Sequence, residues 1–328
     1  MNRLLPSVGV VLAVIVVVLG AYTRLSDAGL GCPDWPGCYG HVGVPESHSE
    51  IAAANSAFPQ RPVEVGKAWK EMVHRYAAGL LGLLILVLFL QEWFTRGEQR
   101  GVVTALAGLV ILQVLLGMWT VTLLVKPLVV TAHLVGGLGT LTLLWLIVLG
   151  RQPGIARDLP GGFPIGVPAL MLAILVVQIL LGGWTSTNYA ALACVGLPQC
   201  NGQWLPAMDF ANGFKPWHGL GIDYEGGILD SPARIAIHYS HRVGAVITFL
   251  VILAGVAVLW RRSTARVLRQ TLLMIVVLLL AQFCLGLANV WFYLPLPVAV
   301  AHNGVAALLL LAVATLNYLA CRSRAVSQ

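Results

Sequence analysis

The chain has 328 residues, of which 58% are hydrophobic and only 10% are charged. Soluble domains carry about 25% charged residues, so this composition excludes a soluble protein and indicates an integral membrane protein. The formal net charge is +7. The basic residues follow a membrane-topology pattern, described below, so the charge gives no reason to expect a nucleic-acid partner.

Eight runs of the sequence are long and apolar enough for a membrane-spanning helix, which needs ~20 mostly apolar residues. They are residues 7–23, 72–91, 102–121, 129–149, 167–185, 237–260, 271–291 and 298–319. The first run is expected to be a span and not a signal peptide, because no small-residue cleavage site follows it and it has a counterpart later in the chain. The sequence therefore predicts an all-α integral membrane fold with eight transmembrane helices.

The connections between the runs differ in charge. If the N-terminus is cytoplasmic, one side of the membrane receives eleven arginines and only three acidic residues, Glu92, Glu98 and Asp158. The other side receives two long loops, about 24–70 and 186–236, and ten of the thirteen acidic residues. Short arginine-rich loops lie inside. We therefore expect a multi-pass protein of a bacterial-type inner membrane with both termini in the cytoplasm.

The chain reads as two copies of a four-helix unit. "QVLLGMWTV" is echoed by "QFCLGLANV", and "TAHLVGG" by "VAHNGVA", with offsets of 162 to 169 residues between matching positions. Four landmarks recur in the same order, which indicates an internal repeat. We expect an N-terminal half, 1–150, and a C-terminal half, 151–328. Because each half has an even number of spans, a pseudo-two-fold axis should run along the membrane normal.

Four histidines fall inside predicted spans, each about one turn below the outer end: His74, His133, His241 and His302. Small residues follow them on the same helical face; these are Ala77, Ala78, Gly136, Gly137, Gly244, Ala245 and Ala306. Two imidazoles can ligate the iron of a flat macrocycle from its two sides, and small neighbours leave room for the ring. The pattern favours one heme site per half, near the outer face. Interhelical hydrogen bonding is the plainer alternative, and zinc would want further ligands nearby.

The halves differ beside the first histidine of each pair. Glu71 lies three residues before His74, whereas His238 occupies the matching position before His241. A carboxylate at the edge of one heme could take a proton or stabilise developing positive charge, although an ordinary interfacial acid would look the same. The sequence assigns no role to His238.

An arginine follows the first histidine of each pair. Arg75 and Arg242 are candidate contacts for heme propionates, because a guanidinium binds carboxylates well, or they snorkel to the membrane interface.

Four of the six cysteines lie in the two outer loops, as Cys32 with Cys38 and Cys194 with Cys200. Both pairs have the spacing C-x5-C, and an outer loop faces an oxidising compartment, so two local disulfides are expected. The remaining cysteines, Cys284 and Cys321, are interpreted as packing residues.

Several of these motifs together resemble the heme A synthases of bacteria and mitochondria over nearly the whole chain. They are "GAYTRLSDAGL", the ExxHR at Glu71, "AHLVGG" around His133, "HYSHR" ending at Arg242, and "AHNG" around His302. The family oxidises the C8 methyl of heme O to a formyl group by successive water-derived hydroxylations, giving heme A for aa3-type terminal oxidases.

The resemblance implies roles for individual residues. His74 and His133 would flank the substrate heme O, with Glu71 as the catalytic carboxylate. His241 and His302 would ligate a heme b cofactor. It also links the pair Cys32 and Cys38 to redox function and leaves the second pair a structural disulfide. An enzyme that produces heme O is a candidate partner, and the electron acceptor stays unassigned.

Two other functions share some of these features. A two-heme b-type cytochrome that transfers electrons across the membrane would have the same histidines, but it does not explain why Glu71 faces His238 in the repeat. A transporter with repeated halves would place Gly, Pro and charged residues at mid-membrane. The predicted spans have plain Leu, Val, Ala and Ile centres, which disfavours the transporter.

Overall fold

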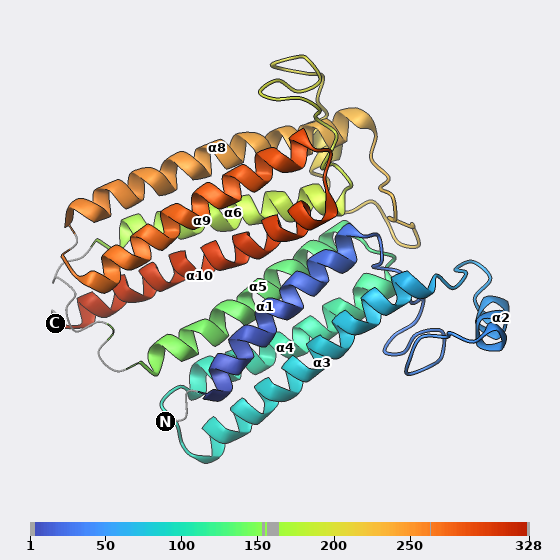
Figure 1. The fold of residues 1–328 in the computed structure, drawn as a ribbon, viewed down its shortest axis with the longest axis horizontal. Helices are drawn as coiled ribbons and strands as arrows, with labels where there is room; N and C mark the ends of the chain where they lie inside the picture. The colour runs from blue at the N-terminus through green and yellow to red at the C-terminus, as the bar shows by residue number, and fades with distance from the viewer. Residues whose placement is uncertain (1–3, 153–154, 156–163, 263, 327–328) are drawn as a thin grey trace.

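The computed structural model describes residues 4–152, 155, 164–262 and 264–326 (Figure 1). These residues form ten α-helices. In chain order they are α1 Leu4–Leu25, α2 His48–Ala57, α3 Val65–Phe94, α4 Arg100–Thr122, α5 Pro127–Gly150, α6 Gly166–Thr187, α7 Phe210–Gly213, α8 Ser231–Arg262, α9 Arg266–Trp291 and α10 Leu296–Val326. All except α2 and α7 are long and apolar enough to cross a membrane, and each of these eight contains one predicted run. The prediction of an all-α multi-pass membrane protein is confirmed.

Two spans begin earlier than the hydropathy pattern predicts. Helix α3 starts at Val65 and α8 at Ser231, because their first turns are amphipathic and do not register as apolar. His74 therefore lies nine residues into its helix, about 13 Å along the axis at 1.5 Å per residue. The expectation that the first histidine of each pair lies one turn below the helix end was wrong, and the same holds for His241 in α8.

The helices form two four-helix bundles that lie side by side (Figure 1). Helices α1, α3, α4 and α5 make one bundle, and α6, α8, α9 and α10 make the other. Between the bundles, α1 contacts α10, α5 contacts α6, and α5 contacts α10. When the two halves are exchanged, this set of contacts maps onto itself, as a pseudo-two-fold relation between the halves requires.

The two ends of the bundles differ. Helix α1 begins and α10 ends at the same end, whereas the two long segments, 26–64 and 188–230, lie at the opposite end, which we call the loop end (Figure 1). Helix α2 stands away from the bundles there. This arrangement places α3, α5, α8 and α10 with their N-termini at the loop end, so the four histidines that follow those N-termini share one end of the molecule.

The interior of both bundles is one continuous apolar core. Leu141 and Leu144 of α5 and Leu316 of α10 are fully buried where the bundles meet. The outward faces are apolar too, as exposed Leu83 on α3 and Val277 on α9 illustrate. Because lipid is as apolar as these side chains, the bundles are held by close packing and hydrogen bonds more than by burial from water.

A buried ion pair closes the first bundle at the end away from the loops. Arg151 and Glu92 bond to each other, and the Arg151 Nε also donates to Oε1 of Gln99 at 2.9 Å. Both charged side chains are almost completely buried. Such a pair adds little net stability over a well-packed apolar pair, but removing one partner alone is strongly destabilising. The pair therefore fixes how the ends of α3, α4 and α5 meet.

At the loop end, a segment of the second half reaches over the first. We call residues 214–225 the strap. Arg61, in the first long loop, pairs with Asp223 at 2.5 Å and also bonds Glu225. The pKa of Arg61 is raised: burial opposes its charge, but the hydrogen bond to Glu225 and the charge of Asp223 outweigh this. The strap is thus tied to the first half by charge-assisted contacts.

The strap also covers the turn between α4 and α5. Lys126, which is 1% exposed, donates from Nζ to the carbonyl oxygen of Gly219 at 2.7 Å. The backbone N–H of Tyr224 donates to the carbonyl of Leu124 at 3.2 Å, and the buried Tyr224 ring packs in a small apolar cluster with that turn. Burial lowers the pKa of Lys126. The loop end of the first bundle is therefore completed by residues of the second half.

Candidate histidine-pair sites

Each bundle holds two of the four histidines on opposite helices. In the first bundle α3 and α5 both contact α1 and α4 and are not principal neighbours of each other, and in the second bundle α8 and α10 stand in the same relation. His74 and His133 are close enough for their charges to interact, and so are His241 and His302. All four imidazoles are half-buried. The structure thus brings together the two pairs predicted from the sequence.

Each of these imidazoles lies against a glycine of a neighbouring helix. A methyl group added at the glycine Cα would lie between 2.9 and 3.5 Å from the imidazole Cε1. The pairs are Gly20 with His74, Gly117 with His133, Gly182 with His241, and Gly286 with His302. Any larger residue would crowd the ring, so glycine at these positions sets where each imidazole can lie.

Sequence reasoning missed these glycines as site residues, although a signal was present. Gly20 and Gly182 occupy matching positions of the repeat, and so do Gly117 and Gly286, with offsets of 162 and 169 residues. A glycine kept in both copies at mid-helix indicates close approach of another group.

Three of the imidazoles have a buried Nδ1 without a hydrogen-bond partner among the described residues: His74, His133 and His302. An unpartnered polar atom inside an apolar bundle is costly, which indicates a missing ligand. Within the described ranges, no group of three or more His, Cys, Asp or Glu side chains gathers to hold a bare metal ion. A heme iron takes four ligands from its macrocycle and needs only two from the protein. Each histidine pair therefore fits a heme.

Glutamine side chains occupy the space beside the pairs. The Nε2 of Gln178 lies 3.0 Å from Nδ1 of His241, and the Nε2 of Gln282 lies 3.2 Å from Nε2 of His302. The amide of Gln113 fills the space beside Gly136. We had interpreted the small residues after the histidines as room for a macrocycle, but at Gly136 and Gly244 that room is taken by glutamines.

Glu71 holds the first disulfide loop onto the bundle. It is 5% exposed, and its Oε2 accepts a hydrogen bond from the backbone N–H of Cys32 at 2.9 Å. Its Oε1 pairs with Nη2 of Arg75 at 2.5 Å. Arg75 in turn donates to the carbonyl oxygens of Asp34 at 3.0 Å and Gly37 at 2.5 Å. One carboxylate and one guanidinium thus fasten this loop next to His74, one helical turn away.

His238 does the same in the second half. Its Nδ1 accepts from the backbone N–H of Cys194 at 3.1 Å. Arg242 donates to the carbonyls of Cys194 at 2.5 Å and Gly196 at 2.9 Å. The Nε of Arg242 also lies 3.3 Å from Nε2 of His238. A neutral imidazole accepts at one nitrogen only, so the shorter contact, from Cys194, is the one we take as the hydrogen bond.

The cysteine pairs are disulfide-bonded as the spacing predicted, Cys32 with Cys38 and Cys194 with Cys200. All four are almost completely buried. The interpretation of Cys284 and Cys321 as packing residues was wrong, because both are exposed on the outer faces of their helices. An outward thiol in a membrane span meets lipid, and hydropathy alone does not show which way it faces.

The fold and these sites define a class: a multi-pass membrane protein of two repeated four-helix bundles, each with an opposed histidine pair beside a disulfide loop. Residues 4–314 match the family model COX15-CtaA, described as cytochrome oxidase assembly protein. With the relatives below, this match shows that the chain belongs to the heme A synthase family.

Three relatives illustrate the range of similarity, and all bear the name heme A synthase. The protein of Shewanella oneidensis is 46% identical over 312 residues, covering 94% of this chain and 93% of its own length. Those of Halalkalibacterium halodurans and Methylobacterium radiotolerans are 27% and 28% identical, covering 98% and 93% of this chain and 97% and 86% of their own lengths. The similarity thus extends over both halves.

Proposed function

We propose that the chain is a heme A synthase, an oxidoreductase that converts the C8 methyl of heme O to a formyl group and so supplies heme A to aa3-type terminal oxidases. The observation that carries the proposal is the asymmetry of two otherwise matching sites. Both halves have an opposed histidine pair, but only the first has a buried carboxylate, Glu71, beside it. A catalyst paired with an electron relay needs that difference, and its membership of the family agrees.

The N-terminal half, 1–150, is the substrate half in this proposal. His74 and His133 hold the substrate heme O, and Glu71 lies on the His74 face of α3, where residues three apart are neighbours. Adding water to the methyl carbon gives a hydroxymethyl group and releases two protons and two electrons. A second such oxidation gives a hydrated aldehyde, which loses water to the formyl group. Glu71 accepts a proton in these steps.

The C-terminal half, 151–328, is the cofactor half, with His241 and His302 as ligands of heme b. When bound, heme b supplies a one-electron relay. A ligating imidazole turns its other ring nitrogen to a second partner, which fixes the ring. Gln178 is in hydrogen-bond range of the His241 Nδ1. Its amide can turn to present Oε1 to an Nδ1–H, so Gln178 orients this ligand.

Arg75 and Arg242 remain candidate propionate contacts. Each guanidinium lies at the loop end, one residue after a histidine of a pair, and each already donates to carbonyls of a disulfide loop. A propionate would share the guanidinium with that loop. Heme binding and loop position are then linked through one side chain.

The same charge bias that predicts topology places both termini in the cytoplasm and the histidine pairs toward the outer face. Heme O is carried to the site in the membrane, because its farnesyl tail is apolar, and an enzyme that makes heme O is a candidate partner for direct transfer.

The experiment is pigment extraction. The chain is expressed with a heme O source in a host that lacks heme A, and the extracted hemes are separated and weighed by mass spectrometry. A species with the mass of heme A or of its hydroxylated precursor is expected. Heme b alone, with heme O present and unchanged, would reject the synthase and favour the two-heme electron-transfer protein.

A further inference from the structure

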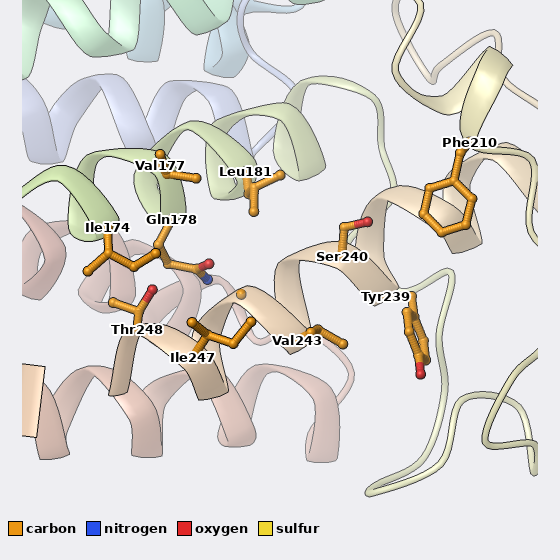
Figure 2. Close-up of a pocket in the computed structure, with 11 residues that line it drawn as sticks. Ile174, Val177, Gln178, Leu181, Phe210, Tyr239, Ser240, Val243, Ile247 and Thr248 are labelled. Carbon is orange, nitrogen blue, oxygen red and sulfur yellow. The ribbon is translucent and has the colours of Figure 1, made fainter. Parts of the chain in front are cut away.

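A groove of about 410 Å³ runs between α6 and α8 in the second bundle (Figure 2). Its walls are mostly apolar; they include Ile174, Val177, Leu181, Val243 and Ile247. Val177, Val243 and Ile247 are each more than 40% exposed, so the groove is open at the bundle surface, where lipid would lie. A membrane-dissolved molecule therefore has direct access to it.

Two polar side chains interrupt this apolar surface. Thr248 is only 4% exposed, and its hydroxyl has no hydrogen-bond partner anywhere in the described part of the chain. The Oε1 of Gln178 is likewise buried and unpartnered there. Figure 2 shows both groups at the same end of the groove. A threonine in a span usually bonds back to the carbonyl four residues earlier, as Thr271 does to Val267. Thr248 does not.

The polar pair is specific to the second half. By the offsets of the repeat, Gln178 matches Val16 (178 minus 162) and Thr248 matches Leu81 (248 minus 167). The first bundle therefore has two apolar side chains at these places. The groove also reaches the histidine pair, because the Gln178 amide that lines it lies 3.0 Å from the His241 imidazole.

We propose that this groove binds the ring of a lipid-soluble quinone, which serves as the electron acceptor. Gln178 lies nine residues before the end of α6 at Thr187, about 13 Å along the helix axis. At that depth only a neutral molecule is stable. The acyl chain of a phospholipid has no atom to pair with the hydroxyl or the amide. A quinone has both features: its carbonyl accepts from the Thr248 hydroxyl, and the hydroxyl of the reduced quinol donates to Oε1 of Gln178.

The electron count agrees with the proposed function, on which this inference rests. Each oxidation of the substrate methyl carbon by water releases two electrons and two protons. A quinone takes up two electrons and two protons to become a quinol, so two quinones are reduced for each formyl group made. The groove lies in the half without Glu71, which separates the acceptor from the site of oxidation.

The test is photoaffinity labelling of the purified, heme-loaded chain in nanodiscs with an azido-ubiquinone. We expect label in peptides covering 174–181 or 239–248, and loss of label with excess decylubiquinone. Thr248→Val should weaken decylubiquinone binding about three- to tenfold, the effect of losing one neutral hydrogen bond. Thr248→Ser should restore it. Thr271→Val is the matched control, because its hydroxyl is already bonded within its own helix.

A second variant guards against a folding defect. Val243→Trp fills the edge of the groove without touching either polar group, so it should abolish labelling while the heme b spectrum stays unchanged. Label confined to other helices, label that persists in Val243→Trp, or a phospholipid that quinone does not displace would overturn the site. Heme A formation in cells is read separately. Heme A made without labelling rejects only the quinone site, and labelling without heme A rejects only the synthase.

Discussion

Glu71 and His238 occupy the same place in the two halves, and each accepts a hydrogen bond from the backbone N–H of the first cysteine in a disulfide loop. The structural task is therefore the same in both halves, and an imidazole performs it as well as a carboxylate. What the second half lacks is the carboxylate. The choice of Glu at 71 is not explained by fastening the loop, which strengthens a chemical role for it.

This equivalence predicts the effect of Glu71→Gln. The amide keeps an oxygen for the Cys32 N–H but removes the proton acceptor, so the loop and heme b should be retained while heme A yield falls about 100-fold or more. His238→Gln is the control, because it preserves the loop contact in the other half and should leave most heme A formation intact. Hemes extracted from both variants give the answer, and undiminished heme A in Glu71→Gln would remove the catalytic role.

Loss of either histidine of the second pair should remove heme b. His241→Ala and His302→Ala each take away one of two iron ligands. The absorption spectrum of the purified protein should lose its low-spin b-type bands. His48→Ala, in the first long loop, should leave them unchanged. Normal spectra in both site variants would show that these residues are not the ligands.

The glycines that face the imidazoles can be tested one half at a time. An alanine Cβ at Gly182 would lie 3.1 Å from the His241 Cε1, and one at Gly20 would lie 2.9 Å from His74. Such overpacking costs about 1–3 kcal/mol. Gly182→Ala should lower heme b occupancy, whereas Gly20→Ala should lower heme A yield with heme b retained. Gly108→Ala, where nothing lies within 4 Å, is the control. Equal effects in all three would contradict the assignment.

Thiol labelling tests the cysteines. With a membrane-permeant maleimide and no reductant, only the exposed Cys284 and Cys321 should react. A variant with both replaced by serine should take up no label until the disulfides are reduced in denaturant. Mass spectrometry counts the labels, and label on Cys32 or Cys194 before reduction would mean that the outer disulfides are absent.

The strap should loosen in acid. Burial, and then the positive charges of Lys215 and Lys126, lower the pKa of His218 from its ordinary value of about 6.5. The folded strap therefore binds a proton less readily than the released strap. Its stability is full above pH 6.5 and declines as the pH falls below that value.

Deuterium exchange over 214–225, corrected for intrinsic rates, should be faster at pH 5.5 than at pH 7.5. His218→Gln should remove the difference. A pH step that persists in the variant would assign it to other groups.

Much of this structure follows from patterns in the sequence. Apolar runs predict the eight spans, and the repeat predicts which histidines pair, because both depend on regular spacing. The early start of α3 at Val65 was missed, since amphipathic turns are not apolar. The contacts of Glu71 and His238 with the loops were missed too, because they join residues about 40 apart through loop geometry that periodicity does not encode. The outward direction of Cys284 depends on helix rotation, which packing decides.

The strap has a consequence for biogenesis. Arg61 and Lys126 of the first half find their partners only in residues 219–225. A ribosome that has completed α5 has therefore delivered a bundle whose loop end still lacks its cover. The first half reaches its final packing only after a further hundred or so residues have been made and the second long loop has crossed the membrane. The duplicated halves are thus obligate partners in assembly, and neither is a free-standing module.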